Sequence, residues 1–181
     1  MGQFFLLQIL RALLLFFPVY FCPLFNHKLL FLINQDIVYS IKSNNCCMVS
    51  IFTEIIEGKR PGFIIFEDEN HVAILDKYPI DTGHSLVIPK TPYEKIIDMP
   101  KNEVAELFSR VPEIANAILK ATGAVAFSIA QNNGKEAKQI IPHVHVHIIP
   151  RYADKATMWT KRGIPSDAEL EQLQKKIVNS F

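Results

Sequence analysis

Cysteine is scarce in this chain, and none of it lies beyond residue 47. The three cysteines of the 181-residue sequence are Cys22, Cys46 and Cys47. The longer, C-terminal part of the chain therefore has no thiol from which to build a disulfide framework or a cysteine metal site. We expect a protein of a reducing compartment, with the cytoplasm as its default location.

An excess of basic residues is also missing. From residue 48 onward, 16 Lys and Arg residues stand against 17 Asp and Glu residues, and no basic run interrupts the mixture. Proteins that bind nucleic acids present basic patches that neutralise phosphates. The charge pattern therefore predicts no nucleic-acid partner, and the length of the chain suggests one domain.

Charge of either sign is nearly absent from residues 1–47, which hold four charged side chains. Residues 4–25 are almost wholly apolar and long enough to span a bilayer as a helix, so a membrane anchor is one interpretation. A cleaved secretory signal fits less well, because no charge precedes the apolar run and no small-residue cleavage site follows it. We favour an upstream extension translated from a start codon that is not used, since Met48 directly precedes the first recognisable motif. A membrane is expected as a partner only if this segment is genuine.

Residues 48–165 have the pattern of one antiparallel-rich α+β domain, and a C-terminal helix is expected within residues 166–181. A short helix is predicted at residues 52–57, with Ser50 as its possible N-cap, and the C-terminal helix at residues 167–178, with Ser166 as its cap. Apolar runs bounded by turn signals predict strands at residues 63–67, 71–75, 85–89, 124–130 and 142–149.

A long helix is predicted between the third and fourth of these strands. Its apolar residues recur at helical spacing from Val104 to Ile118. Pro112 removes one backbone donor and should kink or split the helix, and Gly123 is its expected C-terminal stop.

Three histidines, His143, His145 and His147, alternate with aliphatic residues. Alternation of period two is typical of a half-buried strand, so the aliphatic side chains should face a core and the imidazoles should project together from the other face. A neutral imidazole can be a nucleophile, a proton carrier or a metal ligand. The outer two Cα atoms would lie roughly 13 Å apart on a straight strand. Such a row suits a linear phosphate ester better than one shared metal ion, and chance is a weaker explanation.

The stretch His143–Arg151 resembles the signature of the histidine-triad (HIT) superfamily of nucleotide hydrolases and transferases. Residues 51–58, 75–90 and 131–134 agree with that family in order and spacing, so the resemblance covers about residues 50–161. The chain is more similar to the Hint-like and general microbial branches than to the uridylyltransferase branch, which lacks the third histidine. The resemblance implies a HIT-like α+β fold, with an antiparallel sheet of about five strands, one long helix and short flanking helices. Relatives commonly form homodimers.

The resemblance also implies roles for the histidines. His145 would attack the α-phosphorus of a nucleotide and form a nucleotidyl-histidine intermediate. His143 and His147 would flank it, stabilising the phosphate charge and handling the proton of the leaving group. The sequence does not decide which of the two donates that proton, and His143 could instead only orient His145. His84 falls at the family's fourth histidine position, in a supporting role, whereas His71 matches no motif and should be exposed.

Several residues match positions that bind substrate in the family. Asp76, which Lys77 adjoins, matches the carboxylate that accepts hydrogen bonds from the ribose hydroxyls. Asn132 matches an amide that contacts the phosphate, and Gln139 stands four residues before the triad, as in the family. Apolar residues that would either wall the base pocket or pack in an ordinary core are Ile51, Phe52, Ile55 and Ile74.

The loop before the triad departs from the family pattern. Backbone N–H groups of Lys138, Gln139 and Ile140 could cradle the phosphate, as turn amides often do. The family usually has glycine where Lys138 stands, and some branches have Ser or Thr where Ile140 stands. The phosphoramidate-cleaving branch uses the hydroxyl of that Ser or Thr. Because Ile140 has no hydroxyl, phosphoramidase activity is less strongly expected.

A second departure concerns metal. Many microbial relatives open with Cys-x-x-Cys and can bind structural zinc, but here these positions are Ser50 and Thr53, whose hydroxyls are poor zinc ligands. We expect no zinc and no cofactor, although a dinucleoside polyphosphate could arrive with its own Mg²⁺.

The expected activity is cleavage at the α-phosphate of a purine nucleoside phosphoramidate, mixed anhydride or dinucleoside polyphosphate, with release of the nucleoside monophosphate. The alternative is a nucleotide-binding sensor or scaffold with vestigial turnover. The complete triad, with Asp76 and Asn132, favours the enzyme, whereas the changes at Lys138 and Ile140 keep the alternative open.

Overall fold

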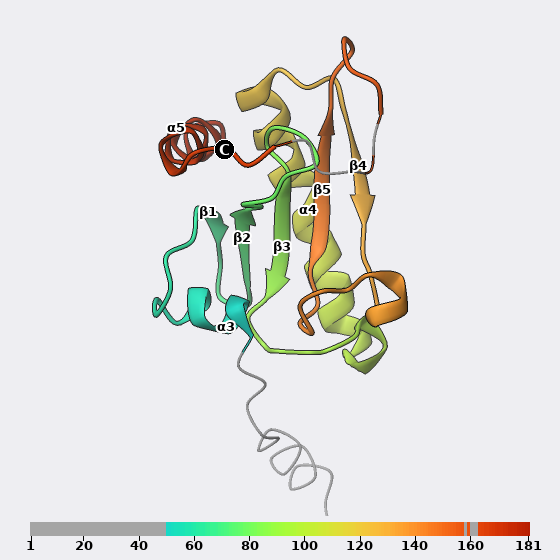
Figure 1. Ribbon diagram of the computed structural model, residues 1–181. Coiled ribbons are helices and arrows are strands. Elements are labelled where there is room, and N and C mark those ends of the chain that lie inside the picture. Colours follow the sequence, from blue (N-terminus) through green and yellow to red (C-terminus); the bar gives the residue numbers. More distant parts are fainter. Residues whose placement is uncertain (1–49, 158, 160–162) are drawn as a thin grey trace, which may run out of the picture. The chain divides into compact units, whose positions relative to one another are not determined.

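The computed structural model describes residues 50–157, 159 and 163–181 (Figure 1). The three interpretations of residues 1–47, an unused extension, a membrane anchor and a cleaved signal, lie outside these described residues. Within them, no helix has the length and apolar character needed to cross a bilayer. Residues 48–181 form one structural unit, which includes the C-terminal helix.

Five antiparallel strands form one sheet in the order β1-β2-β3-β5-β4. The strands are β1 (Ile64–Glu67), β2 (His71–Leu75), β3 (Ser85–Pro89), β4 (Ala126–Ala130) and β5 (Val146–Arg151). β5 lies between β3 and β4, where His147 pairs with Leu86 on one side and with Ala130 on the other. The α+β class and the five-stranded antiparallel sheet are confirmed.

The helices begin and end near the predicted residues. They are α3 (Ile51–Ile56), α4 (Lys101–Thr122) and α5 (Asp167–Val178), with short 3-10 helices η2 (Ile96–Asp98) and η3 (Lys135–Ala137). Ser50 and Ser166 form capping boxes at α3 and α5, and Gly123 ends α4 with a left-handed backbone. Pro112 does not split α4, whose buried apolar stripe continues on both sides of it.

Both faces of the sheet are covered, because alternate residues of the central strands enter two different apolar clusters. Ala73 and Leu75 join the cluster beneath α4 and α5, whereas Val72 and Ile74 join the cluster beneath α3. β2 and β3 are consequently buried at every position. Figure 1 shows α4 running along one face of the sheet and α3 at the edge of the other.

The prediction of a regular strand from residue 142 was wrong, since β5 begins at Val146. The backbone N–H of Val144 donates to the carbonyl of Tyr93, in the segment after β3, instead of joining a strand ladder. Side-chain alternation nevertheless holds, because Val144, Val146 and Ile148 all enter the cluster beneath α4. His71, predicted to be exposed, is buried and its Nδ1 lies 3.2 Å from an oxygen of Asp68.

Candidate active site

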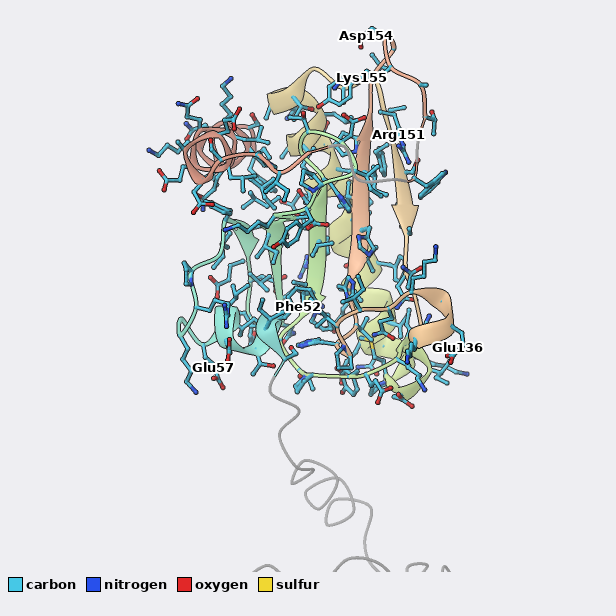
Figure 2. All side chains as sticks on the ribbon, viewed as in Figure 1. Phe52, Glu57, Glu136, Arg151, Asp154 and Lys155 are labelled. Atoms are coloured by element: carbon cyan, nitrogen blue, oxygen red, sulfur yellow. The ribbon has the colours of Figure 1, made fainter. Side chains whose placement is uncertain are left out.

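The sequence suggested that the imidazole row lies on an open surface, but the structure shows otherwise. His143 is fully buried and His145 is 6% exposed, because α3 covers this face of the sheet. The ring of Phe52, from α3, meets the ring of His145 edge to face, with 5.1 Å between the centroids (Figure 2 labels Phe52). The covering helix comes from 90 residues earlier in the chain, so the local alternation gave no sign of it.

The orientation of His145 is set by one backbone carbonyl. Its Nδ1 lies 2.7 Å from the carbonyl oxygen of His143. A carbonyl can only accept, so Nδ1 carries the proton and donates it. In the neutral ring, Nε2 therefore holds the lone pair. Burial lowers the pKa of His145, so this neutral, nucleophilic form is the one present near pH 7.

His143 has both ring nitrogens engaged within the protein. Nε2 donates to the carbonyl of Pro89 over 2.8 Å, and Nδ1 accepts from the hydroxyl of Ser50 over 2.9 Å. Ser50 also accepts from the N–H of Thr53 as the N-cap of α3. The geometry makes His143 a positioning residue, which ties α3 to the carbonyl that orients His145.

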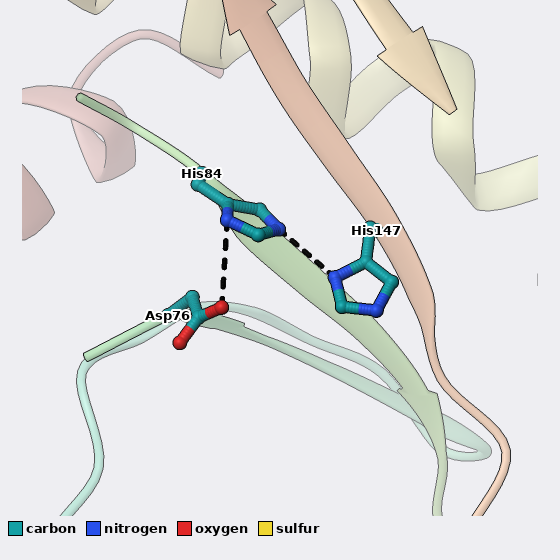
Figure 3. Close-up of side chains that lie close together, drawn as sticks. All are labelled: Asp76, His84 and His147. Carbon is teal, nitrogen blue, oxygen red and sulfur yellow. Dashed lines mark hydrogen bonds and ion pairs between the residues drawn. The ribbon is translucent and has the colours of Figure 1, made fainter. Parts of the chain in front are cut away.

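His84 and His147 are hydrogen-bonded to each other, and Asp76 lies on the far side of His84 (Figure 3). The N–H of Ile80 donates to Nδ1 of His84 over 3.1 Å, so in the neutral ring the proton is on Nε2. Nε2 of His84 then donates to Nδ1 of His147 over 2.9 Å. By the same rule, His147 carries its proton on Nε2. Oδ2 of Asp76 lies 3.4 Å from Nδ1 of His84.

Burial also governs the charge of the other two triad members. It lowers the pKa of His143, and with the neighbouring rings of His145 and His84 it lowers the pKa of His147 to about 3. Without substrate the triad is therefore neutral near pH 7. A bound phosphate anion would favour protonation, since an opposite charge stabilises the charged form of histidine.

Asp76, His84 and His147 are also the one group among the described residues whose ligand atoms, all within 4.8 Å of one another, could hold a metal ion. The facing nitrogens of His84 and His147 are 2.9 Å apart. Two nitrogens on one tetrahedral zinc, each bound at 2.0–2.1 Å, would be about 3.3 Å apart. The arrangement matches a hydrogen bond between the rings, and the absence of zinc stays a prediction.

Two of the three backbone N–H groups predicted to bind phosphate, at residues 138–140, already donate hydrogen bonds within the protein. The N–H groups of Lys138 and Gln139 donate to carbonyls of Lys135 and Gly134, within the loop itself. The side chain of Gln139 braces the same loop, accepting from the N–H of Gly134 and donating to the carbonyl of Glu94. Within the described ranges, Ile140 is the member of this group whose N–H has no partner. Its side chain is 80% exposed.

The backbone explains why the family pattern has glycine at position 138. Lys138 has φ 63°, and among the described residues it is the one non-glycine residue with positive φ. This left-handed conformation is strained for a residue with a Cβ atom and free for glycine. The loop therefore holds Lys138 in a conformation that glycine would adopt at a lower cost in free energy.

The remaining predicted residues divide between the site and its surroundings. Asn132 is half-buried two residues beyond Ala130, the β4 partner of His147. Asp76 faces His84, and its other oxygen accepts from the N–H of Tyr78. Lys77 instead forms an ion pair with Asp167 of α5, at 3.2 Å, so we leave it out of the proposed site.

The apolar candidates lie together beside the triad. Phe52, Ile55 and Ile74 are buried in the cluster beneath α3, and Ile51 is 41% exposed at the start of that helix. Sequence reasoning missed the contact from Ser50 to His143 and the contact from Ile80 to His84. Ser50 was recognised as an N-cap, but nothing in the local pattern indicated a partner 93 residues away.

Comparison with known proteins agrees with this geometry. The HIT domain pattern matches residues 57–154. Adenylylsulfatase HINT3 of Arabidopsis thaliana is 40% identical over 139 residues, which cover 74% of this chain and 68% of that protein. Adenosine 5'-monophosphoramidase HNT1 of Saccharomyces cerevisiae is 34% identical over 131 residues, covering 71% of this chain and 80% of that protein.

Solved structures give the same result. A hypothetical histidine triad nucleotide-binding protein from Sulfolobus tokodaii superimposes with a TM-score of 0.66 and 36% identity, covering 71% of this chain and 89% of that one. A zinc-bound histidine triad family protein from Mycobacterium smegmatis has a TM-score of 0.65 and 32% identity, covering 76% and 94%. With its triad, its fold and these relatives, the chain belongs to the histidine-triad (HIT) family.

Proposed function

We propose that this protein is a nucleotide hydrolase that cleaves at the α-phosphate through a nucleotidyl intermediate on His145. The relatives named adenylylsulfatase and phosphoramidase support the general class. The observation that carries the proposal is the hydrogen bond from Nδ1 of His145 to the carbonyl of His143, which leaves the lone pair on Nε2. Nucleophilic catalysis divides one difficult hydrolysis into two easier steps.

In the first step, Nε2 of His145 forms a bond to the α-phosphorus while the bond to the leaving group breaks. The imidazole then carries a positive charge, which the carbonyl of His143 stabilises at Nδ1–H. In the second step, water attacks the phosphorus and gives up a proton to the His84–His147 pair, the bond to Nε2 breaks and the nucleoside monophosphate is released.

His147 is the proposed proton donor to the leaving group. Its Nε2–H leaves with that group, and Nδ1 is refilled by the proton on Nε2 of His84. The transfer needs one proton more than the neutral pair holds. Binding of the anionic substrate favours uptake of that proton, and the attacking water returns a proton to the pair in the second step. A sulfate leaving group needs no such proton, whereas an amine does, so this pair should matter most for phosphoramidates.

The nucleoside would lie beneath α3. Phe52, Ile55 and Ile74 offer an apolar wall for a purine base, and Asp76 offers a carboxylate to the ribose hydroxyls. Asn132 and the N–H of Ile140 would contact the phosphate. No cofactor enters this scheme, and Mg²⁺ would come only with a polyphosphate substrate.

The test is AMP release from a panel of adenylyl sulfate, adenosine 5'-monophosphoramidate and a diadenosine polyphosphate. Turnover of at least one of them by the wild type, with loss of turnover in His145→Ala, is the expected result. Because His145→Ala removes the attacking atom and few ground-state contacts, AMP should still bind. Binding of AMP without turnover of any substrate would favour the nucleotide sensor instead.

We also propose that the protein is a homodimer joined along β4. This strand is an edge strand of the sheet. Val125, directly before it, and Phe127 and Ile129 within it have side chains that are 68%, 38% and 46% exposed. An exposed apolar edge strand invites pairing with another strand. Sedimentation should show a dimer for the wild type and a monomer for Ile129→Lys, and a monomeric wild type would contradict the proposal.

A further inference from the structure

A turn directly after β5 contacts the loop that carries His84. The ammonium of Lys155 forms an ion pair with Asp81 at 3.0 Å, and the hydroxyl of Tyr152 donates to the carbonyl of Thr82 over 2.9 Å. Lys155 also lies 4.2 Å from the centre of the Tyr152 ring. Figure 2 shows Lys155 at the opposite end of the sheet from Phe52.

Asp81 needs this partner because its side chain is only 4% exposed. Burying a carboxylate is costly, and removing Lys155 takes away a countercharge that offsets this cost. The carbonyl of Asp81 accepts from the N–H of His84 over 3.0 Å, and its Oδ1 accepts from the N–H of Thr82 over 3.1 Å. The ion pair therefore holds Asp81 in place, and Asp81 in turn holds the backbone of His84 through its carbonyl.

The same loop decides which nitrogen of His84 carries the proton. Ile80, the residue before Asp81, supplies the N–H that occupies Nδ1 of His84. A displacement of Asp81 would move this N–H away and leave Nδ1 beside the Asp76 carboxylate, 3.4 Å from its Oδ2. A carboxylate favours a proton on the facing nitrogen, so the other tautomer would then become accessible.

We propose that Asp81 and Lys155 are positioning residues for His84. Their ion pair holds the loop in the conformation that keeps the His84 proton on Nε2, where it is donated to His147. β5 thus carries His147, and Lys155, just beyond the end of the same strand, orients His84, the hydrogen-bond partner of His147. The kinetic consequence rests on the proposed function, whereas the tautomer of His84 does not.

The test compares Lys155→Met, which keeps the aliphatic length and removes the charge, with Lys90→Met. Lys90 pairs with Glu67 at 2.7 Å, at the opposite end of β3 from His84, and serves as the matched control. Ring ¹⁵N NMR shifts should show His84 protonated on Nε2 in the wild type and in the control, and a mixture of tautomers in Lys155→Met. The kcat for AMP release from adenosine 5'-monophosphoramidate should fall roughly 10- to 100-fold in Lys155→Met with KM nearly unchanged, as a small misplacement of a catalytic group costs.

A second variant controls for the case in which Lys155→Met fails to fold. Asp81→Asn/Lys155→Met removes the buried carboxylate charge together with the Lys155 cation, and it should fold while giving the same mixture of tautomers. A single Nε2–H tautomer of His84 in both variants, with kcat equal to that of the control, would overturn the inference. If the wild type releases no AMP from any substrate, the proposed function fails, and the tautomer measurement alone then decides the inference.

Discussion

At the scale of single residues, the site depends on which ring nitrogen of each histidine carries the proton. Three backbone groups decide this: the carbonyl of His143 for His145, the carbonyl of Pro89 for His143, and the N–H of Ile80 for His84. None of these groups belongs to a side chain. The protonated nitrogen of these rings is therefore set largely by backbone groups. Substitution of neighbouring side chains alters it only indirectly, by moving the backbone.

Ser50 combines two functions, of which Ser166 shares only one. Both serines cap helices, so Ser50→Ala and Ser166→Ala should each lower the free energy of unfolding by about 1 kcal/mol. Ser50→Ala also removes the hydrogen bond to Nδ1 of His143, which frees that ring to turn. We expect kcat to fall roughly tenfold in Ser50→Ala only. Urea unfolding and AMP-release assays on both variants check this, and equal kcat values would refute the link.

Lys138 offers a stability test of the strained loop. Lys138→Gly removes the cost of a left-handed Cβ, part of which the greater freedom of glycine in the unfolded chain offsets. The free energy of unfolding should rise by about 0.5–1 kcal/mol, as measured by urea unfolding. Lys138→Ala keeps the strain and should give no gain. Destabilisation by glycine would show that the lysine side chain makes a favourable interaction that outweighs the strain.

At the scale of the elements, local signals predicted most of the boundaries. β2, β3 and α5 occupy the predicted residues, because turn residues and a capping serine mark their ends within the chain itself. The start of β5 was misplaced because Val144 pairs with Tyr93 from a distant segment. Alternation shows which side chains share a face, but it does not show that α3 covers the face of His145.

The candidate site was predictable to a similar extent. The resemblance to the HIT family predicted that His84 lies close to the triad, and in the structure its Nε2 is 2.9 Å from Nδ1 of His147. The partners of Lys77 and Gln139 were not predictable, because Asp167 and Glu94 come from other segments. The turn at Tyr152 and Lys155 also carried no motif, and its contact with the His84 loop depends on tertiary packing alone.

Gly83 tests how tightly the His84 loop is packed onto its neighbouring elements. It has φ +84°, and a Cβ atom there would lie 2.9 Å from Cγ2 of Thr122 in α4 and 3.2 Å from Cγ of Pro150 in β5. Gly123 has a similar φ of +72° but open space around it. Both Gly83→Ala and Gly123→Ala incur the left-handed strain of roughly 1–2 kcal/mol.

Only Gly83→Ala adds a clash with two elements. We expect it to lower the melting temperature further than Gly123→Ala and to reduce kcat, because His84 follows directly. Thermal unfolding and turnover of the two variants provide the comparison. If the two variants lost the same stability and kept the same kcat, the loop would be less constrained than the structure indicates.

At the scale of the whole molecule, the buried triad couples folding to pH. Burial lowers the pKa of His143, of His145 and of His147 below the ordinary value of 6.5, to about 3 for His147. Well above pH 6.5 these rings are neutral in both the folded and the unfolded state and contribute no pH dependence. As the pH falls from 6.5 toward 3, the unfolded chain binds protons that the folded protein does not, so the folded state loses stability.

The free energy of unfolding should therefore be lower at pH 5.5 than at pH 7.5 in urea titrations. Each neutral buried histidine contributes up to about 1.4 kcal/mol per pH unit within its window. His147→Gln removes one such group and should make the dependence shallower, whatever its effect at pH 7.5. A free energy of unfolding that stayed constant or rose on acidification would show that the triad is charged in the folded protein.

The central claim is that Nε2 of His145 forms a covalent bond to the nucleotide. Turnover of adenylyl sulfate or adenosine 5'-monophosphoramidate, quenched within the first cycle under alkaline conditions that preserve a phosphorus–nitrogen bond, should yield protein heavier by one adenylyl group. Peptide mass spectrometry should place that group on His145, and His145→Ala should give neither adduct nor turnover. An adduct on another residue, or turnover retained by His145→Ala within about tenfold of the wild type, would contradict the account.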